Sequence, residues 1–267
     1  MIKPTSALAS TPSLIDPETA EPKGIPFSGS PQSISTDDLM HHLSPIVTAV
    51  MVDAEFFLRR VKRICGELSP EEAALKLHEM ALLHLNGRHP SRLYRIFVYD
   101  APPAEGRHHT PLNKKSIDFS KSDIAIWRRA FHEKLRGLRK VALRMGEIHK
   151  NDPFWQIKPE ALKELLDGAK QWGDLKDSDF RPDIRQKGVD MRLGLDIASL
   201  AFKRQVNQII LVSGDADFVP AAKLARREGV DFVLDPMGAI IRPDLNEHID
   251  GLRSVLRPKK KAVKPLN

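Results

Sequence analysis

The sequence predicts an α/β fold: a three-layer sandwich in which helices cover both faces of a central, mainly parallel sheet of about five strands. One observation behind this prediction is that short apolar runs alternate along the chain with segments of helical periodicity. The other is that each run is apolar throughout, as expected for strands that are buried on both faces of a parallel sheet.

The elements follow one another in a regular order. The predicted strands are Ile46–Val52, Tyr94–Tyr99, Val141–Ile148, Ile209–Val212 and Val230–Leu234. Apolar residues at helical spacing predict helices at Phe56–Ile64, Glu71–Leu85, Ile124–Lys140, Val189–Arg204 and Phe218–Arg227, and a short helix from about Asp244. Residues 104–122 are expected to form a polar loop.

Three regions are expected along the chain. Residues 1–37 hold six of the twenty prolines and many serines without a periodic apolar pattern, which predicts a disordered head. Residues 38–252 form the predicted domain, with an insertion at about residues 149–186 that contains a helix from Pro159 to Ala169. Residues 253–267 are expected to form a basic flexible tail, because Pro258 and Pro265 discourage a continued helix.

Composition narrows the class of protein. The chain of 267 residues is 41% apolar and 29% charged, which is typical of a soluble globular protein, and it has neither a membrane-spanning run nor a signal-peptide pattern. Its one cysteine, Cys65, excludes internal disulfides and zinc sites built from thiolates, so a cytoplasmic protein is expected. A dinucleotide-binding glycine motif, a Walker loop and a nucleophile elbow are all missing.

Carboxylates stand where the predicted strands end. Asp53 follows the first strand, and Asp215 and Asp217 follow the strand Ile209–Val212, before the next helix. Ligands of open parallel sheets bind at the carboxyl ends of strands, so these acids are expected to meet at one edge of the sheet. Asp190 comes just before a helix and could reach the same edge. Asp217 has a competing interpretation as the N-cap of that helix.

Several carboxylates at one edge raise one another's pKa unless a cation lies between them. Hard oxygen ligands suit Mg²⁺ or Mn²⁺, which serve phosphate-ester chemistry by activating water. Asp53, Asp190 and Asp215 are therefore the expected metal ligands. Asp196 lies within an apolar helix face about 9 Å along the helix from Asp190, so it is expected to orient a ligand or to contact a second metal. Ser213 is expected to orient a carboxylate or phosphate.

Three motifs in this order resemble a known family. Val50-Met51-Val52-Asp53, Lys187-Gly188-Val189-Asp190 and Leu211–Phe218 (LVSGDADF) are similar to the NYN domain, LabA-like branch, of the PIN-like nuclease superfamily. The resemblance extends from about Val47 to Leu252, with the middle insertion outside it. It implies a PIN-like sandwich, a metal site and ribonuclease activity, with the family's acids at Asp53, Asp190, Asp215 and Asp217. Many members place an Asn shortly after the first Asp, where this chain has Phe56.

The expected activity is therefore that of a metal-dependent endoribonuclease, with RNA of unknown class as the partner and single-stranded DNA still open as a substrate. Basic residues offer two surfaces for nucleic acid, although solvated charge also explains such runs. The candidates are Arg128, Arg129, Arg136 and Lys140 around the helix, and Lys259, Lys260 and Lys261 in the tail. The alternative is a PIN-like RNA-binding or regulatory protein with weak or no catalysis, which Phe56 favours and the retained acids oppose.

Overall fold

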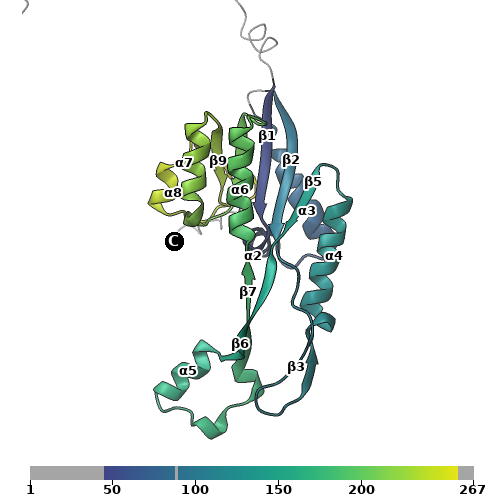
Figure 1. Ribbon diagram of the computed structural model, residues 1–267, viewed down its shortest axis with the longest axis vertical. Helices are drawn as coiled ribbons and strands as arrows, with labels where there is room; N and C mark the ends of the chain where they lie inside the picture. The colour runs from purple at the N-terminus through teal and green to yellow at the C-terminus, as the bar shows by residue number, and fades with distance from the viewer. Residues whose placement is uncertain (1–44, 88–89, 258–267) are drawn as a thin grey trace, which may run out of the picture. The chain divides into compact units, whose positions relative to one another are not determined.

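The structure is a computed structural model that describes residues 45–87 and 90–257 (Figure 1). The predicted head, residues 1–37, lies outside the described residues. The same holds for Lys259, Lys260 and Lys261 in the predicted tail.

Six parallel strands form the main sheet, in the spatial order β10-β9-β8-β1-β2-β5. The strands are β1 (Ile46–Asp53), β2 (Ser91–Asp100), β5 (Val141–Met145), β8 (Gln208–Val212), β9 (Asp231–Asp235) and β10 (Gly251–Leu252). The predicted α/β class and parallel sheet are confirmed. The sixth strand is β10, whose two residues carry no recognisable apolar run.

Alternate residues of each central strand enter two separate cores. Ala49 and Met51 of β1 pack into one core together with Ile209 and Leu211 of β8. The residues between them on β1 and β8 pack into the other core on the opposite face. Because side chains of a strand point alternately to the two faces, a strand that is apolar throughout fits only a sheet covered on both sides.

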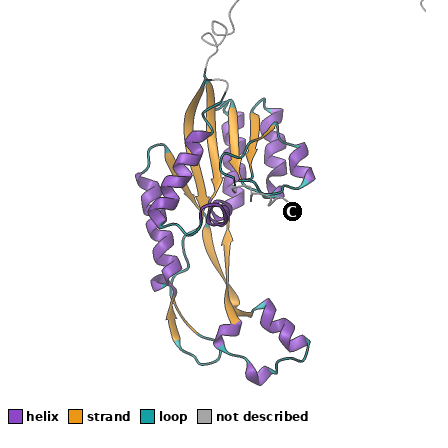
Figure 2. Ribbon diagram, turned by 180° about the vertical axis from the view of Figure 1, so that it is seen from behind, coloured by secondary structure: helices purple, strands orange, loops and turns teal. Residues whose placement is uncertain are grey.

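Helices cover both faces and complete the three layers (Figure 2). One face carries α2 (Ala54–Cys65), α3 (Pro70–Leu83) and α4 (Asp123–Gly137), and the other carries α6 (Val189–Phe202), α7 (Val219–Arg227) and α8 (Pro243–Glu247). Local sequence sets the helix starts. Ser69, for example, accepts from the backbone of Glu72 while Glu72 accepts from the backbone of Ser69, which satisfies two amides at the start of α3.

The order in which the chain adds strands to the sheet reverses between β1 and β8. From β1 it adds β2 and β5 on one side, and it then returns through α6 to β8 and adds β9 and β10 on the other side. The register pairs Val52 with Val212, so the start of α2, which comes directly after β1, and the turn after β8 emerge next to each other. In open α/β sheets this switch point is the usual position of a ligand site.

The predicted strand Val141–Ile148 is two strands. β5 ends at Met145, and β6 (Glu147–Ile157) leaves the main sheet to pair with β7 (Phe180–Lys187). Gly146 allows this departure: a Cβ on Gly146 would lie 2.6 Å from Val189 Cγ2 and 2.7 Å from Lys187 O. The apolar run thus continues through a glycine at which the backbone changes sheets.

The antiparallel ribbon of β6 and β7 carries α5 (Pro159–Leu166) at its far end (Figure 1). Two short 3-10 helices, η2 (Trp172–Asp174) and η3 (Asp177–Asp179), lie between α5 and β7. These elements, from β6 to β7, cover the residues of the predicted insertion, about 149–186. The expected loop at residues 104–122 is only partly a loop, because it contains the hairpin β3 (Arg107–His109) and β4 (Ser116–Asp118) and the 3-10 helix η1 (Phe119–Lys121).

The first residues of the predicted tail pack on the domain. Arg253 donates hydrogen bonds to the carbonyl oxygens of Leu83, His84 and Asn86 at 2.7–3.2 Å, so it satisfies carbonyls at the end of α3. The guanidinium of Arg253 therefore serves to hold the folded domain together. None of the helices in the described ranges combines the length and apolar character needed to cross a bilayer.

Candidate functional site

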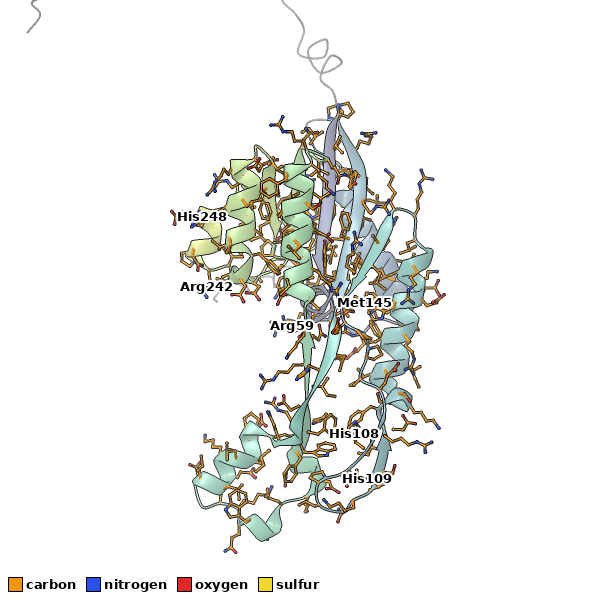
Figure 3. The ribbon with its side chains drawn as sticks, in the orientation of Figure 1. Arg59, His108, His109, Met145, Arg242 and His248 are labelled. Atoms are coloured by element: carbon orange, nitrogen blue, oxygen red, sulfur yellow. The ribbon has the colours of Figure 1, made fainter. Side chains whose placement is uncertain are left out.

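A cleft of about 370 Å³ lies at the switch point, where β1 and β8 end. Asp53 and Asp215 both line it, so the structure brings together two of the predicted site residues. The cleft is also lined by a group of guanidinium side chains, here called the arginine cluster: Arg59, Arg60, Arg63 and Arg242. Figure 3 labels Arg59 and Arg242, which come from different elements and lie at the same edge of the main sheet. Carboxylates and guanidinium groups thus face one small space.

Asp53 ends β1 and begins α2. Its Oδ1 accepts the backbone N–H of Phe56 at 3.0 Å, which makes it the N-cap of the helix. Burial raises the pKa of Asp53 to about 6, although the hydrogen bond from Phe56 opposes the shift, and the negative charges of Glu55 and Asp190 raise the pKa further. The position therefore holds a carboxylate that is costly to ionise and that a nearby cation would stabilise.

Asp215 and Ser213 shape the turn after β8. Asp215 Oδ1 accepts the backbone N–H of Asp217 at 3.0 Å, and Ser213 Oγ accepts the backbone N–H of Asp215 at 3.2 Å. The N-cap of the short 3-10 helix η4 (Ala216–Phe218) is therefore Asp215, and the competing interpretation of Asp217 as an N-cap is wrong. Ser213 is fully buried and orients the Asp215 turn, whereas the side chains of Asp215 and Asp217 are exposed.

Asp190 reaches the same edge from α6. Because α6 precedes β8 and runs back across the sheet, its first turn lies at the carboxyl ends of the strands. Gly188 starts the helix with a φ of 76°, a conformation that favours glycine. Burial raises the pKa of Asp190, and the charges of Asp215, Asp217 and Glu55 raise it further. These three carboxylates therefore lie near enough to Asp190 for their charges to disfavour its ionised form.

The chemistry of this donor set fits a hard divalent ion, since Asp53, Asp190 and Asp215 offer carboxylate oxygens that repel one another without a cation. Their side-chain arrangement is looser: within residues 45–87 and 90–257, no three acidic, histidine or cysteine side chains are grouped closely enough to hold a metal ion. Asp190 and Asp215 are exposed. Rotation of these two side chains toward Asp53 would therefore cost little packing, and for Asp215 it would exchange the hydrogen bond from the Asp217 backbone for the metal contact.

The arginine cluster is the part of the site that the sequence did not assign. Three of its members lie on α2, shortly after Asp53. Their spacing along this predicted helix could have indicated that they lie close to Asp53. Arg60 donates to the carbonyl oxygen of Met237 at 2.7 Å, while its buried Nε has no hydrogen-bond partner among the described residues. Arg242 comes from the segment before α8. Nothing in the local sequence places it near Asp53, because only the fold brings it to the cleft.

Phe56 also lines the cleft, at the position where the resemblance leads to an expected Asn. Its side chain is only 9% exposed and packs in the core that includes Val52 and Val212. The ring therefore serves as an apolar wall between the ends of β1 and β8.

Asp196 has partners on the sheet. Tyr99 donates its hydroxyl to Asp196 Oδ2 at 2.9 Å, and Arg144 Nε lies 3.1 Å from the same oxygen. Burial and the Asp196 charge both raise the pKa of Tyr99, so this hydroxyl keeps its proton. These contacts explain how the inward face of α6 accommodates a carboxylate.

The basic residues on and after α4 that were predicted to bind nucleic acid each contact another group of the same chain. Arg128 Nη1 lies 2.5 Å and 2.6 Å from the two carboxylate oxygens of the buried Asp100, which also accepts from the ring of His132. The other three have partners as well: Arg129 donates to the Ser120 carbonyl, Arg136 lies 3.3 Å from Glu133, and Lys140, beyond the end of α4, donates to the Leu93 carbonyl. Arg129 and Arg136 remain largely exposed.

A search of the solved structures returned a protein of unknown function from Vibrio parahaemolyticus, with a TM-score of 0.41 and 15% sequence identity over 79% of this chain and 93% of that chain. No curated protein matched the sequence.

The family model of the NYN domain matches residues 151–239. This range contains Asp190, Asp215 and Asp217 but does not reach Asp53. It also includes most of residues 149–186, the predicted insertion, which was expected to lie outside the resemblance. The match supports a place for this chain in the NYN/PIN-like superfamily.

Proposed function

We propose that this protein is a metal-dependent endoribonuclease that hydrolyses phosphodiester bonds in the cleft between β1 and β8. The observation that carries the proposal is that Asp53 and Asp215 line the same cleft as the arginine cluster. The NYN match supports it, because that family has a nuclease fold of the PIN-like kind. The three quoted motifs favour the LabA-like branch.

The arginine cluster supplies the binding part of this function. Guanidinium groups suit phosphate oxygens, since their planar forks donate two parallel hydrogen bonds. Arg60 is positioned for this by its bond to the Met237 carbonyl, and Arg59 and Arg63 project from the same helix. A nucleic-acid backbone would therefore be held beside the carboxylates.

Asp53, Asp190 and Asp215 would hold a Mg²⁺ or Mn²⁺ ion. When bound, such an ion supplies a water of lowered pKa and neutralises negative charge on the leaving oxygen. Ser213 and the backbone N–H of Asp217 fix the turn that carries Asp215. The raised pKa of Asp53 means that metal binding and ionisation of this carboxyl are coupled.

Phe56 favours a second candidate function, that of an RNA-binding or regulatory protein with weak or no catalysis. It occupies a wall of the cleft with an apolar ring that can neither bind a metal nor contact phosphate through a polar atom. The arginine cluster would bind RNA equally well in such a protein.

A cleavage assay separates the two functions. Purified full-length protein is incubated with structured and single-stranded RNA in Mn²⁺, in Mg²⁺ and in chelator, beside Asp215→Asn and the matched surface variant Asp167→Asn. A nuclease cleaves with metal and loses cleavage in chelator and in Asp215→Asn, while Asp167→Asn keeps it. RNA binding without cleavage under any of these conditions would favour the second function.

A further inference from the structure

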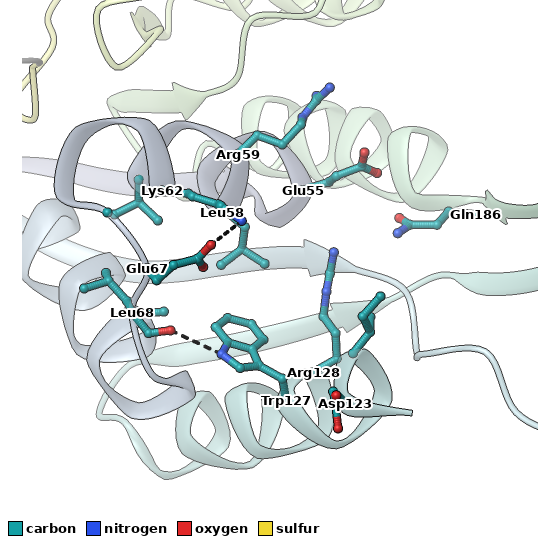
Figure 4. A pocket seen from close by; sticks show the side chains of 14 residues that line it. Glu55, Leu58, Arg59, Lys62, Glu67, Leu68, Asp123, Trp127, Arg128 and Gln186 are labelled. Atoms are coloured by element: carbon teal, nitrogen blue, oxygen red, sulfur yellow. Dashed lines mark hydrogen bonds and ion pairs between the residues drawn. The ribbon is translucent and has the colours of Figure 1, made fainter. Parts of the chain in front are cut away.

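A groove of about 630 Å³ lies between α2 and α4, beside the cleft. Its apolar lining comes from Leu58, Val61, Leu68, Ile124 and Trp127. Polar side chains stand around this lining, among them Glu55, Asp123 and Gln186 (Figure 4). A space of this size accommodates a nucleotide-sized ligand.

Trp127 is held rigidly in this groove. Its indole N–H donates to the carbonyl oxygen of Leu68 at 3.2 Å, and its ring stacks on Phe131 with the centroids 5.3 Å apart. The side chain is half-buried, so part of the ring surface faces the groove. A ligand there would meet the apolar ring of Trp127, since the indole N–H is already engaged.

The groove and the cleft are connected through α2. Arg59 lines both spaces. Its guanidinium extends away from the groove in Figure 4. Glu55 stands one turn earlier on the same helix, and its charge raises the pKa values of Asp53 and Asp190 in the catalytic region. A nucleic-acid chain with a phosphate at Arg59 would therefore carry a neighbouring nucleotide to the mouth of the groove.

We infer that the groove between α2 and α4 binds one nucleobase of the same nucleic acid whose phosphate lies in the cleft, an inference that rests on the proposed function. The combination of an aromatic wall with a polar rim fits a flat ring that has an apolar face and hydrogen-bonding edges. Base stacking on aromatic side chains is a general means of holding single strands. The carboxylates of Glu55 and Asp123 are acceptors suited to the amino and imino groups of a base.

The test uses abasic oligonucleotides. Binding of labelled eight-nucleotide single-stranded RNA to the full-length protein is measured by fluorescence anisotropy in chelator. One oligonucleotide carries all its bases, and the others each lack one base at successive positions. The variants are Ile124→Glu, at a 75% exposed residue of the groove, and the matched control Ile126→Glu, at a 54% exposed residue of the same helix outside it. Glutamate is compatible with both exposed helical positions.

With wild-type protein, loss of the base at one position should weaken binding about tenfold or more, whereas loss elsewhere changes it little. Ile124→Glu should weaken binding of the intact RNA and remove this position dependence, and Ile126→Glu should leave both unchanged. Equal binding of all oligonucleotides, or an unchanged profile in Ile124→Glu, would overturn the inference. Cleavage in Mn²⁺ is scored separately, so a nuclease that does not use the groove is distinguished from a binding protein that does.

Discussion

The ring of Phe56 lies directly against Gly214: a Cβ placed on Gly214 would stand 2.7 Å from Phe56 Cε2 and 3.3 Å from Cζ. Phe56 lies in the first turn of α2, directly after β1, and Gly214 follows β8, so the contact joins the two segments that leave these strands beside the cleft. The glycine is explained by this close approach, since contacts below about 3.0 Å to a Cβ require the neighbouring atoms to shift.

Gly214→Ala should therefore cost about 1–3 kcal/mol of unfolding free energy through overpacking. The same substitution should cost less in a Phe56→Leu background, because leucine lacks the two ring atoms that the new methyl group would meet. Urea denaturation of the two single variants and the double variant measures this coupling.

Gly194→Ala serves as the control, because nothing lies within 4 Å of a Cβ at that position in α6. It should leave stability unchanged or raise it slightly, since alanine favours a helix more than glycine does. A cost of Gly214→Ala that is the same in both backgrounds would contradict the contact with Phe56.

Local sequence was sufficient to predict the central strands and the carboxylates at their ends. β1 and β8 were recognisable because both faces of each strand are buried, and their parallel pairing then places Asp53 beside the Asp215 turn. Ser213 was noticed because it stands beside Gly214 without a nucleophile elbow, and its Oγ accepts the backbone N–H of Asp215.

Contacts between residues far apart in the sequence could not be predicted. Arg242 reaches the cleft only through the packing of the segment before α8. The carboxylate of Asp196 was noticed within an apolar helix face, but its partners Tyr99 and Arg144 lie on strands distant in the chain. β10 has two residues, too few for any periodic pattern.

Asp53 should make stability depend on pH. Its pKa is about 6 in the folded protein and near the ordinary 3.8 when unfolded, so the folded state binds more protons between these values. The contribution of Asp53 to stability is thus fully present below pH 3.8 and is lost as the pH rises through 6. In chelator, Asp53→Asn should melt about 2–4 °C above the wild type at pH 8 and close to it at pH 4.

Thermal melts across this pH range measure the difference, with Asp167→Asn at the end of α5 as the control for loss of a surface charge. Asp167→Asn should show no comparable rise between pH 4 and pH 8. A wild type that is more stable than Asp53→Asn at pH 8 in chelator would show that the carboxylate is better solvated than its burial indicates.

Bound metal should reverse the order of the melting temperatures of the wild type and Asp53→Asn at pH 8. Mn²⁺ or Mg²⁺ that binds the folded protein raises its melting temperature by linkage, and the ion needs the Asp53 charge. At pH 8, saturating Mn²⁺ should therefore stabilise the wild type by several degrees and Asp53→Asn much less. Equal shifts in the two proteins would mean that the ion binds elsewhere.

The arginine cluster should dominate the electrostatic part of RNA binding. Arg63→Ala and Arg242→Ala each remove a cation from the cleft, so each should weaken binding at low salt and reduce the slope of log affinity against log salt by about 0.7 for a single strand. Arg242 and Arg136 each lie beside a carboxylate, Asp244 at 2.8 Å and Glu133 at 3.3 Å, but only Arg242 lines the cleft, so Arg136→Ala on α4 should have the smaller effect. Titrations at several salt concentrations compare the two surfaces, and a larger loss in Arg136→Ala would place the main contact on α4.

Asp190 and Asp196 lie on the same helix and should differ in what their loss affects. Asp190→Asn removes a carboxylate that its neighbours repel, so cleavage in Mn²⁺ should be abolished while stability in chelator stays the same or rises. Asp196→Asn weakens the contacts to Tyr99 and Arg144, so stability should fall while cleavage persists below the melting temperature. Melting curves and cleavage rates are measured on the same preparations. Loss of cleavage in a folded Asp196→Asn protein would instead support the sequence-based expectation that Asp196 orients a ligand or contacts a second metal.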